Sequence, residues 1–157
     1  AVPGLVAKPI LDIGVAVRHA TDLEPCVAPL AALGYRFLGD RRGVGDWFFA
    51  KGRGDLCTHY VHVVEHASSA WANYLAFRDA LATDERVRSE YASLKQRLLV
   101  ESGGNRDAYA TGKDQFVRRV TAAVLGTAPD GSGGIHQAGS TPWATSAPSN
   151  CQWTGTR

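Results

Sequence analysis

Apolar positions in the first 65 residues follow short, strand-like patterns. Residues 10–17 (ILDIGVAV) form a β-branched apolar run that only Asp12 and Gly14 interrupt. Residues 56–65 (LCTHYVHVVE) alternate, so that His59 and His62 are expected on opposite faces of one strand. Turn-rich stretches at residues 39–46 and 51–55 separate the remaining apolar runs. The pattern predicts four strands, over residues 10–17, 35–38, 47–51 and 56–65.

Helical spacing of apolar residues dominates from residue 69 onward and also occurs once between the first two strands. The early helix is expected from a cap at Thr21 or Asp22 to Leu33, with Pro29 inside it and Gly34 as its stop. Three further helices are expected over residues 69–81, 84–101 and 106–125. This order predicts an α+β fold, a small mixed β-sheet of about four strands with helices packed on one side.

The character of the chain changes after residue 125. From residue 126 to residue 157 the only charged residues are Asp130 and Arg157, and glycine, proline, serine and threonine are frequent. Such a segment buries too little apolar surface to order itself. We therefore expect one domain over residues 1–125 and a disordered tail over residues 126–157. A partner-binding peptide or a frameshifted terminus is the alternative for the tail.

Charge and cysteine usage narrow the classes of function. The chain has 17 basic and 15 acidic residues, a net charge of +2, which does not support nucleic-acid binding by a large basic surface, although a local basic groove remains open. No apolar run approaches the roughly 20 residues that span a bilayer, and no signal peptide is visible. Cys26, Cys57 and Cys151 lack zinc-site spacing and favour free thiols in a reducing compartment. We expect a cytoplasmic protein without a membrane anchor; no pattern indicates an oligomeric state.

Asp12 is the residue that most directly suggests chemistry. A carboxylate within an apolar strand is costly unless it has a partner or binds a cation, so Asp12 is either a locally paired strand-end residue or a functional acid. His59 and His62 cannot both ligate one metal without a bulge, and one of them is expected to share the surface of Asp12. Adjacent Arg78 and Asp79 are not expected to face each other. The glycine-rich stretches match neither phosphate-loop nor dinucleotide-binding patterns.

Six segments in order resemble the GrpB family of bacterial proteins across about residues 1–120. They are VPGLVAKPILDI, GYRFLGD, FFAKG, THYVHVVE, LAFRDALATDERVRSEYASLK and RDAYATGKDQFV. The family is similar to polymerase-β-type nucleotidyltransferases. The resemblance thus implies a nucleotidyltransferase-like fold with Mg²⁺ as cofactor, in which two carboxylates of an Asp-x-Asp hold the metal.

The resemblance also assigns roles to residues of this chain. Asp12 matches the first carboxylate of the motif and is implied to be catalytic and a metal ligand. His62 matches a histidine of the family's His-Leu-His-Val strand and is implied to be catalytic, with His59 as its partner. Substrate binding is implied for five positions: Lys8, Lys51, His59, Arg78 and Lys113. Tyr91, Lys95 and Tyr109 also match family positions, and the tyrosines are expected to pack.

Two departures from the family pattern shape the expectation. Gly14 stands where the second acid of the nucleotidyltransferase motif is expected, a position at which the family itself often has an apolar residue, and the Gly-Ser step of those enzymes would lie upstream of Ala1. Together with the absence of methionine, this predicts that an N-terminal part of the domain is missing.

Three functional hypotheses follow from these residues. The first is Mg²⁺-dependent transfer of a nucleoside monophosphate from a triphosphate to an unknown acceptor. The second is a non-catalytic module that binds a nucleotide or a protein. The third, metal-dependent hydrolysis, requires His59 or His62 to converge with Asp12. A small molecule or nucleotide is the expected partner.

Overall fold

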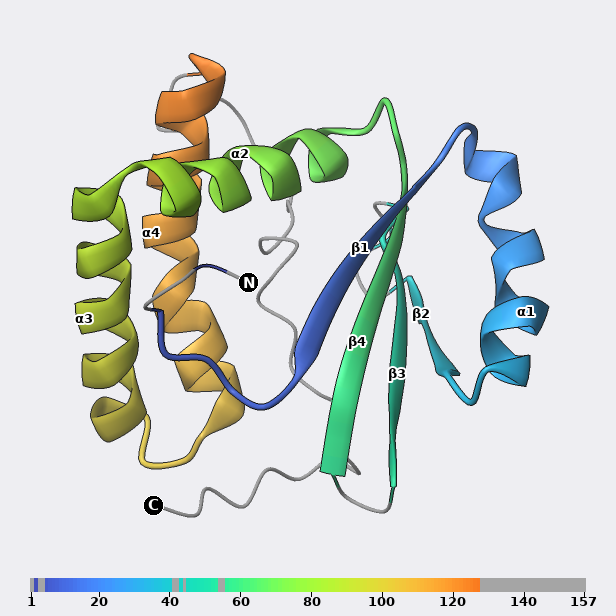
Figure 1. Cartoon of the computed structure of the whole chain (residues 1–157), viewed down its shortest axis with the longest axis horizontal. Coiled ribbons are helices and arrows are strands. Elements are labelled where there is room, and N and C mark those ends of the chain that lie inside the picture. Colours follow the sequence, from blue (N-terminus) through green and yellow to red (C-terminus); the bar gives the residue numbers. More distant parts are fainter. Residues whose placement is uncertain (1, 3–4, 41–42, 44, 54–55, 128–157) are drawn as a thin grey trace. The chain divides into compact units, whose positions relative to one another are not determined.

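The computed structural model describes residues 2, 5–40, 43, 45–53 and 56–127 (Figure 1). Their strands are β1 (Leu11–Val17), β2 (Arg36–Asp40), β3 (Trp47–Arg53) and β4 (Leu56–Glu65). Their helices are the 3-10 turns η1 (Ala20–Asp22) and η2 (Glu24–Cys26), and α1 (Val27–Ala32), α2 (Ser69–Thr83), α3 (Glu85–Glu101) and α4 (Arg106–Leu125). The predicted order of strands and longer helices is confirmed.

The chain divides into two compact units, and each is described by itself. The sheet unit runs from residue 7 to residue 72, and the helical unit includes residues 73–127. The sheet has the order β1-β4-β3-β2. β1 runs parallel to β4, whereas β3 is antiparallel to both β4 and β2. The predicted α+β class with a mixed, four-stranded sheet is therefore confirmed.

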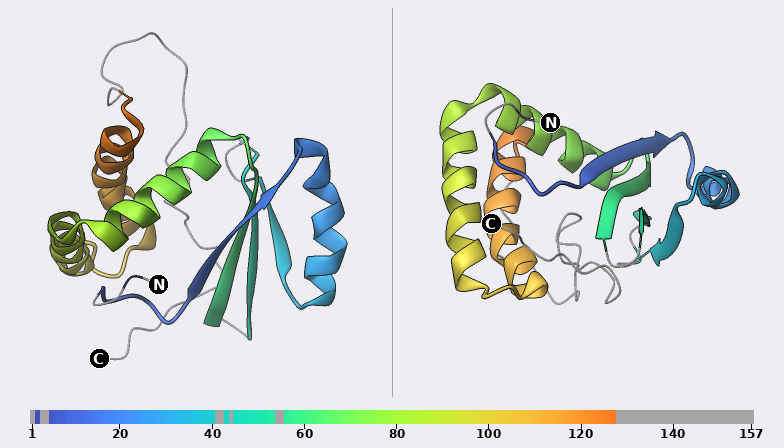
Figure 2. Two further views of the ribbon diagram at one scale, coloured as in Figure 1. Left: turned by 45° about the horizontal axis from the view of Figure 1, so that its top comes forward. Right: turned by 60° about the horizontal axis from the view of Figure 1, so that its bottom comes forward.

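The two faces of the sheet carry different side chains, because successive residues of a strand point to opposite sides. Phe49, Val61 and Val63 pack with Leu23 in one buried cluster, against which α1 places Val27 and Leu30. We call this side the α1 face (Figure 2). On the opposite side Phe48, Ala50 and Tyr60 form a second cluster. Since Asp12 pairs with Tyr60 across β1 and β4, we call this side the Asp12 face.

The single early helix predicted up to Leu33 is wrong. The chain instead forms η1 and η2 and then a six-residue α1. Pro25 lies at the start of η2 and Pro29 lies inside α1. Proline has no backbone N–H to donate, so each interrupts the hydrogen-bond ladder that a longer helix needs. Gly34, with a φ of 84°, follows α1 as predicted.

The helical unit has its own core. Ala80, Phe116, Val117 and Val120 are buried, with Phe77, Tyr91 and Leu94 packed against them. Tyr91 stacks on Phe116 at 5.3 Å between ring centroids and meets Phe77 edge-on at 5.2 Å. This confirms the expectation that Tyr91 packs.

Side-chain caps at the N-terminal ends of α3 and α4 explain why these helices begin close to their predicted limits. Asp84 accepts hydrogen bonds from the backbone amides of Arg86 and Val87, and Asn105 accepts from those of Asp107 and Ala108. These caps satisfy amides that have no partner within the helix. Gly126, with a φ of 66°, ends α4. The predicted disordered tail lies outside the described residues from residue 128 onward.

Candidate functional site

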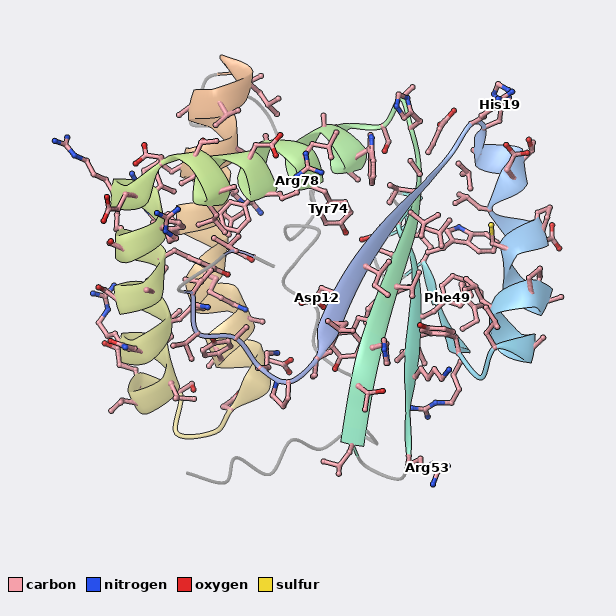
Figure 3. All side chains as sticks on the ribbon, in the orientation of Figure 1. Asp12, His19, Phe49, Arg53, Tyr74 and Arg78 are labelled. Atoms are coloured by element: carbon pink, nitrogen blue, oxygen red, sulfur yellow. The ribbon has the colours of Figure 1, made fainter. Side chains whose placement is uncertain are left out.

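The side chain of Asp12 is exposed on the sheet. It is the second residue of β1, the strand at one edge of the sheet (Figure 3). Its side chain is exposed and forms no hydrogen bond or ion pair with any residue of the described chain. The sequence left two alternatives for Asp12, a locally paired strand-end residue or a functional acid. Among the described residues, the structure shows no local partner for its side chain. Asp12 is a carboxylate that can accept an external ligand.

Gly14 adjoins Asp12 on the same face, is exposed, and lies close to one edge of an indole ring. A Cβ atom at position 14 would lie 3.3 Å from Cζ3 of Trp71, which is tighter than an ordinary van der Waals contact. A carboxylate side chain is much larger than a methyl group. A side chain at the position that the resemblance gives to a second acid would therefore require Trp71 to give way by a few tenths of an ångström.

His62 also lies on the Asp12 face, as the alternation predicts for one of the two histidines. It pairs with Gly14 of β1 on one side and with Phe48 of β3 on the other. The ring of Phe48 is 4.8 Å from that of His62. Asp46 lies just before β3. Its carboxylate oxygens Oδ1 and Oδ2 lie 3.0 Å and 3.2 Å from Nδ1 of the His62 imidazole. Both residues are buried, with 7% and 6% of their surface exposed.

Lys51 and His59 come together, but on the other side of the sheet. They are paired across β3 and β4, two residues from Phe49 and Val61 of the α1 face. The Lys51 ammonium lies 5.3 Å from the centre of the Tyr35 ring, and His59 meets the same ring edge-on. Their predicted role in substrate binding stays a prediction. A ligand held by Asp12 on one face would have the sheet between it and these two side chains.

Three further cationic residues, Lys8, Arg78 and Lys113, were predicted to bind substrate. Lys8 is exposed and lies three residues before β1, in the sheet unit. Arg78 and Lys113 belong to the helical unit. Lys113 lies over the ring of Tyr109, with its ammonium 4.4 Å from the ring centre. Their predicted contacts with substrate stay predictions.

Arg78 corrects one expectation from the sequence. Its Nε donates to Oδ1 of the adjacent Asp79 at 2.7 Å, although neighbouring helix residues were not expected to face each other. The long arginine side chain folds back over the exposed helix surface to reach the carboxylate. This hydrogen bond raises the pKa of Arg78 and lowers the pKa of Asp79. An anion at Arg78 would compete with Asp79.

Asp46 and Trp71 are the residues of this face that sequence reasoning missed. Asp46 ends a turn-rich stretch, where an aspartate is ordinary. Its contact with His62 spans 16 residues and depends on how β3 pairs with β4. Trp71 looked like one more apolar residue of α2. Alternation along residues 56–65 could only indicate that His62 has the same side as Tyr60.

The described residues contain no group of three or more His, Cys, Asp or Glu side chains arranged to hold a metal ion. The hydrolase hypothesis, which needs such a convergence on Asp12, gains no support. None of the described helices is long and apolar enough to cross a membrane. Cys26 is a free thiol, as expected.

Known proteins of similar sequence share most of this chain. UPF0157 protein PA4798 of Pseudomonas aeruginosa is 39% identical over 128 residues, which are 80% of this chain and 52% of that protein. UPF0157 protein YqkA of Bacillus subtilis is 32% identical over 74% of this chain and 34% of its own length. The chain thus spans about half of the first relative and a third of the second. Glutamate-rich protein GrpB of Alkalihalophilus pseudofirmus is 36% identical, over 76% of this chain and 71% of that protein.

A solved structure and a protein family give the same result. The crystal structure of conserved protein GrpB from Enterococcus faecalis superposes with a TM-score of 0.70 at 28% sequence identity, covering 80% of this chain and 74% of that one. The family described as GrpB protein matches residues 1–123. With a family match over most of its length and relatives that agree with it, this chain belongs to the GrpB family.

Proposed function

We propose that the Asp12 face binds a nucleoside triphosphate as its magnesium complex, and that the site transfers the nucleoside monophosphate to an acceptor. The observation that carries this proposal is the exposed carboxylate of Asp12, which no described residue engages. The similarity of the family to nucleotidyltransferases supplies the choice of ligand. His62 on the same face supplies a second polar group.

The residues present fit one magnesium ion rather than two. Mg²⁺ in proteins is commonly held by one or two carboxylates together with substrate phosphates and water. Asp12 would provide the one carboxylate, while Gly14 beside Trp71 provides none. When bound, the ion would neutralise phosphate charge. Lys8, exposed near the start of β1, would add positive charge in the same unit.

The chemistry of the proposed transfer can be written with this chain's residues. An acceptor oxygen or nitrogen attacks the α-phosphorus, the bond to the β-phosphate bridging oxygen breaks, and pyrophosphate leaves. The acceptor's proton passes to the imidazole of His62. The protein's share of such a reaction is chiefly positioning and charge stabilisation.

Calorimetric titration tests the binding. ATP, CTP, GTP and UTP are titrated into the protein with Mg²⁺ and with EDTA, and the experiment is repeated with Asp12→Asn. Losing one interaction with a charged ligand weakens binding about tenfold or more. Glu24→Gln is the matched control, because Glu24 is an exposed acid of η2, the turn before α1. Equal affinities for wild type and Asp12→Asn, or no binding at all, would remove the proposal.

A second candidate is a non-catalytic binding module of the same fold. It is favoured by the single carboxylate, since Gly14 leaves the second acid position of the nucleotidyltransferase motif without a metal ligand. Release of pyrophosphate from each bound triphosphate separates the two candidates. Magnesium-dependent binding with release supports the transferase. Binding that needs no metal and gives no release supports the module.

A further inference from the structure

A β-bulge interrupts the pairing of β3 with β4 beside Lys51 and His59. Lys51 of β3 pairs with His59 of β4. The next residue of β3 pairs with Cys57, so Thr58 is an extra residue of β4. Bulges of this kind bend a strand and re-aim the side chains beside them, and they are common next to functional sites. The bulge is thus the local feature that orients the side chain of His59.

The hydroxyl group of Thr58 holds the imidazole of His59 through Nδ1. This hydroxyl donates its one hydrogen to the carbonyl oxygen of Lys51 at 3.2 Å, and its oxygen lies 2.8 Å from Nδ1 of His59. Because the hydrogen is already used, the oxygen accepts at the second contact and Nδ1 donates. The other ring nitrogen, Nε2, forms no hydrogen bond with any described residue. Since His59 is partly exposed, Nε2 is the ring nitrogen that can meet a ligand from solvent.

Both basic side chains rest against one anchored aromatic ring. Tyr35 packs against the buried cluster of the α1 face, which includes Phe49 and Val61. The Lys51 ammonium lies over the Tyr35 ring, 5.3 Å from its centre. His59 meets the same ring edge-on, with 6.2 Å between the ring centres. The ring therefore keeps an ammonium and an imidazole together at one end of the α1 face.

The positive charge at this end of the face has no counter-charge within the described chain. Lys51 is partly exposed and forms no ion pair with any described residue. The residue beside His59 on β1 is Leu11, which is apolar. Basic side chains directly opposite each other on two strands repel when both are charged. An anion bound to both would remove this repulsion and would engage the ammonium and Nε2.

We propose that Lys51, His59 and Tyr35 form an anion site on the α1 face, which takes a phosphate group independently of Asp12. The site goes beyond the proposed function, because the sheet separates it from a ligand held at Asp12. A phosphate group fits better than a carboxylate, since it carries a charge of about −1.5 to −2 at pH 7 and three accepting oxygens. The ammonium supplies three donors to these oxygens. A protonated imidazole adds a fourth from Nε2, while Thr58 continues to accept from Nδ1.

Nitrogen-15 NMR of histidine-labelled protein tests the site. Inorganic phosphate and methyl phosphate are each added at constant pH in the presence of EDTA, with potassium chloride as the control for ionic strength. Phosphate binding should shift the imidazole nitrogens of His59 saturably and leave those of exposed His66 in place. The probe that binds more tightly identifies free phosphate or a phosphate ester as the source of the group. No saturable shift at His59 with either probe would overturn the proposal.

Three variants separate this site from nonspecific attraction and from the Asp12 face. Lys51→Gln should weaken phosphate binding about tenfold or more, because it removes a charged partner. Arg18→Gln loses the same charge next to the far end of β1, so it is the matched control and should bind as wild type does. Asp12→Asn should also bind as wild type does. Unchanged affinity in Lys51→Gln, or an equal loss in Arg18→Gln or Asp12→Asn, would contradict the proposal. Thermal unfolding verifies that each variant is folded.

Discussion

Gly14 and Trp71 are in close contact: a Cβ atom at position 14 would lie 3.3 Å from Cζ3 of the indole. The contact lies within the sheet unit, between β1 and the start of α2. Asp12 is the one carboxylate of β1, and Gly14 follows it on the same face. The effects on stability of substitutions at Gly14 and at Trp71 are therefore expected to depend on each other.

Placing an acid at position 14 should therefore destabilise the protein. Gly14→Asp forces a side chain against the indole, and such overpacking costs about 1–3 kcal/mol. Trp71→Ala removes the obstacle, so the double variant should lose less stability than the sum of the two single changes. Urea unfolding of all four proteins measures the difference. Strictly additive losses would show that the contact has no energetic weight.

Gly52 is predicted to be essential to the β3–β4 hairpin. A Cβ atom at this position would lie 1.9 Å from the carbonyl oxygen of Leu56, a backbone atom that cannot turn aside. The register between β3 and β4 also shifts between Lys51 and Gly52. Gly52→Ala should lower the free energy of unfolding by about 1–3 kcal/mol or more. Arg53→Ala, at the exposed neighbouring residue, is the control and should change it little.

Tyr109 should make the helical unit sensitive to alkali. Burial raises the pKa of this half-buried phenol, so the folded state favours its protonated form. Its contribution is complete below the unfolded pKa of about 10 and is lost as the pH rises through the raised value. Ultraviolet titration should find that Tyr109→Phe lacks one tyrosine of the wild type, and that the missing tyrosine ionises later than a free phenol. A difference between the two titrations at the pH of a free phenol would contradict the assignment.

The ion pair of Arg78 and Asp79 should lose its contribution to stability at acid pH, whereas Tyr109 loses its contribution at alkaline pH. The hydrogen bond from Arg78 lowers the pKa of Asp79, so its stabilising effect is present above the unfolded carboxyl pKa and is lost as the pH falls through the lowered value. Carboxyl carbon NMR should show Asp79 titrating at a higher pH in Arg78→Gln than in wild type, and an unchanged titration would contradict the assignment. Since the pair is exposed, global stability should barely respond.

The sequence predicted the backbone well where a simple period decides the structure. Alternation over β4 and helical spacing over α3 and α4 were enough, because burial on one side selects those periods. The early helix failed because two prolines remove backbone donors that the apolar pattern does not register. Local patterns therefore predict helices and strands well, but they predict less well where prolines interrupt a helix.

The candidate site was predictable only in part. Asp12 is conspicuous as a charge in an apolar strand, and alternation predicted that one of His59 and His62 shares its side without deciding which. The contacts of these residues did not follow. Asp46 reaches His62 across 16 residues, and Trp71 reaches Gly14 through the path of the chain after β4. Separation of Lys51 and His59 from Asp12 likewise needed the pairing of β3 with β4. Such facts depend on tertiary structure.

The central claim is that Asp12 holds the metal of a bound nucleotide. Manganese replaces magnesium in many nucleotide complexes and broadens the NMR signals of nearby nuclei. Adding manganese ATP to nitrogen-15-labelled protein should first broaden the amides around Asp12 in β1 and its partner Tyr60 in β4, and spare α1. Asp12→Asn should lose this pattern, whereas Glu24→Gln should keep it. Broadening centred elsewhere, or unchanged in Asp12→Asn, would contradict the account.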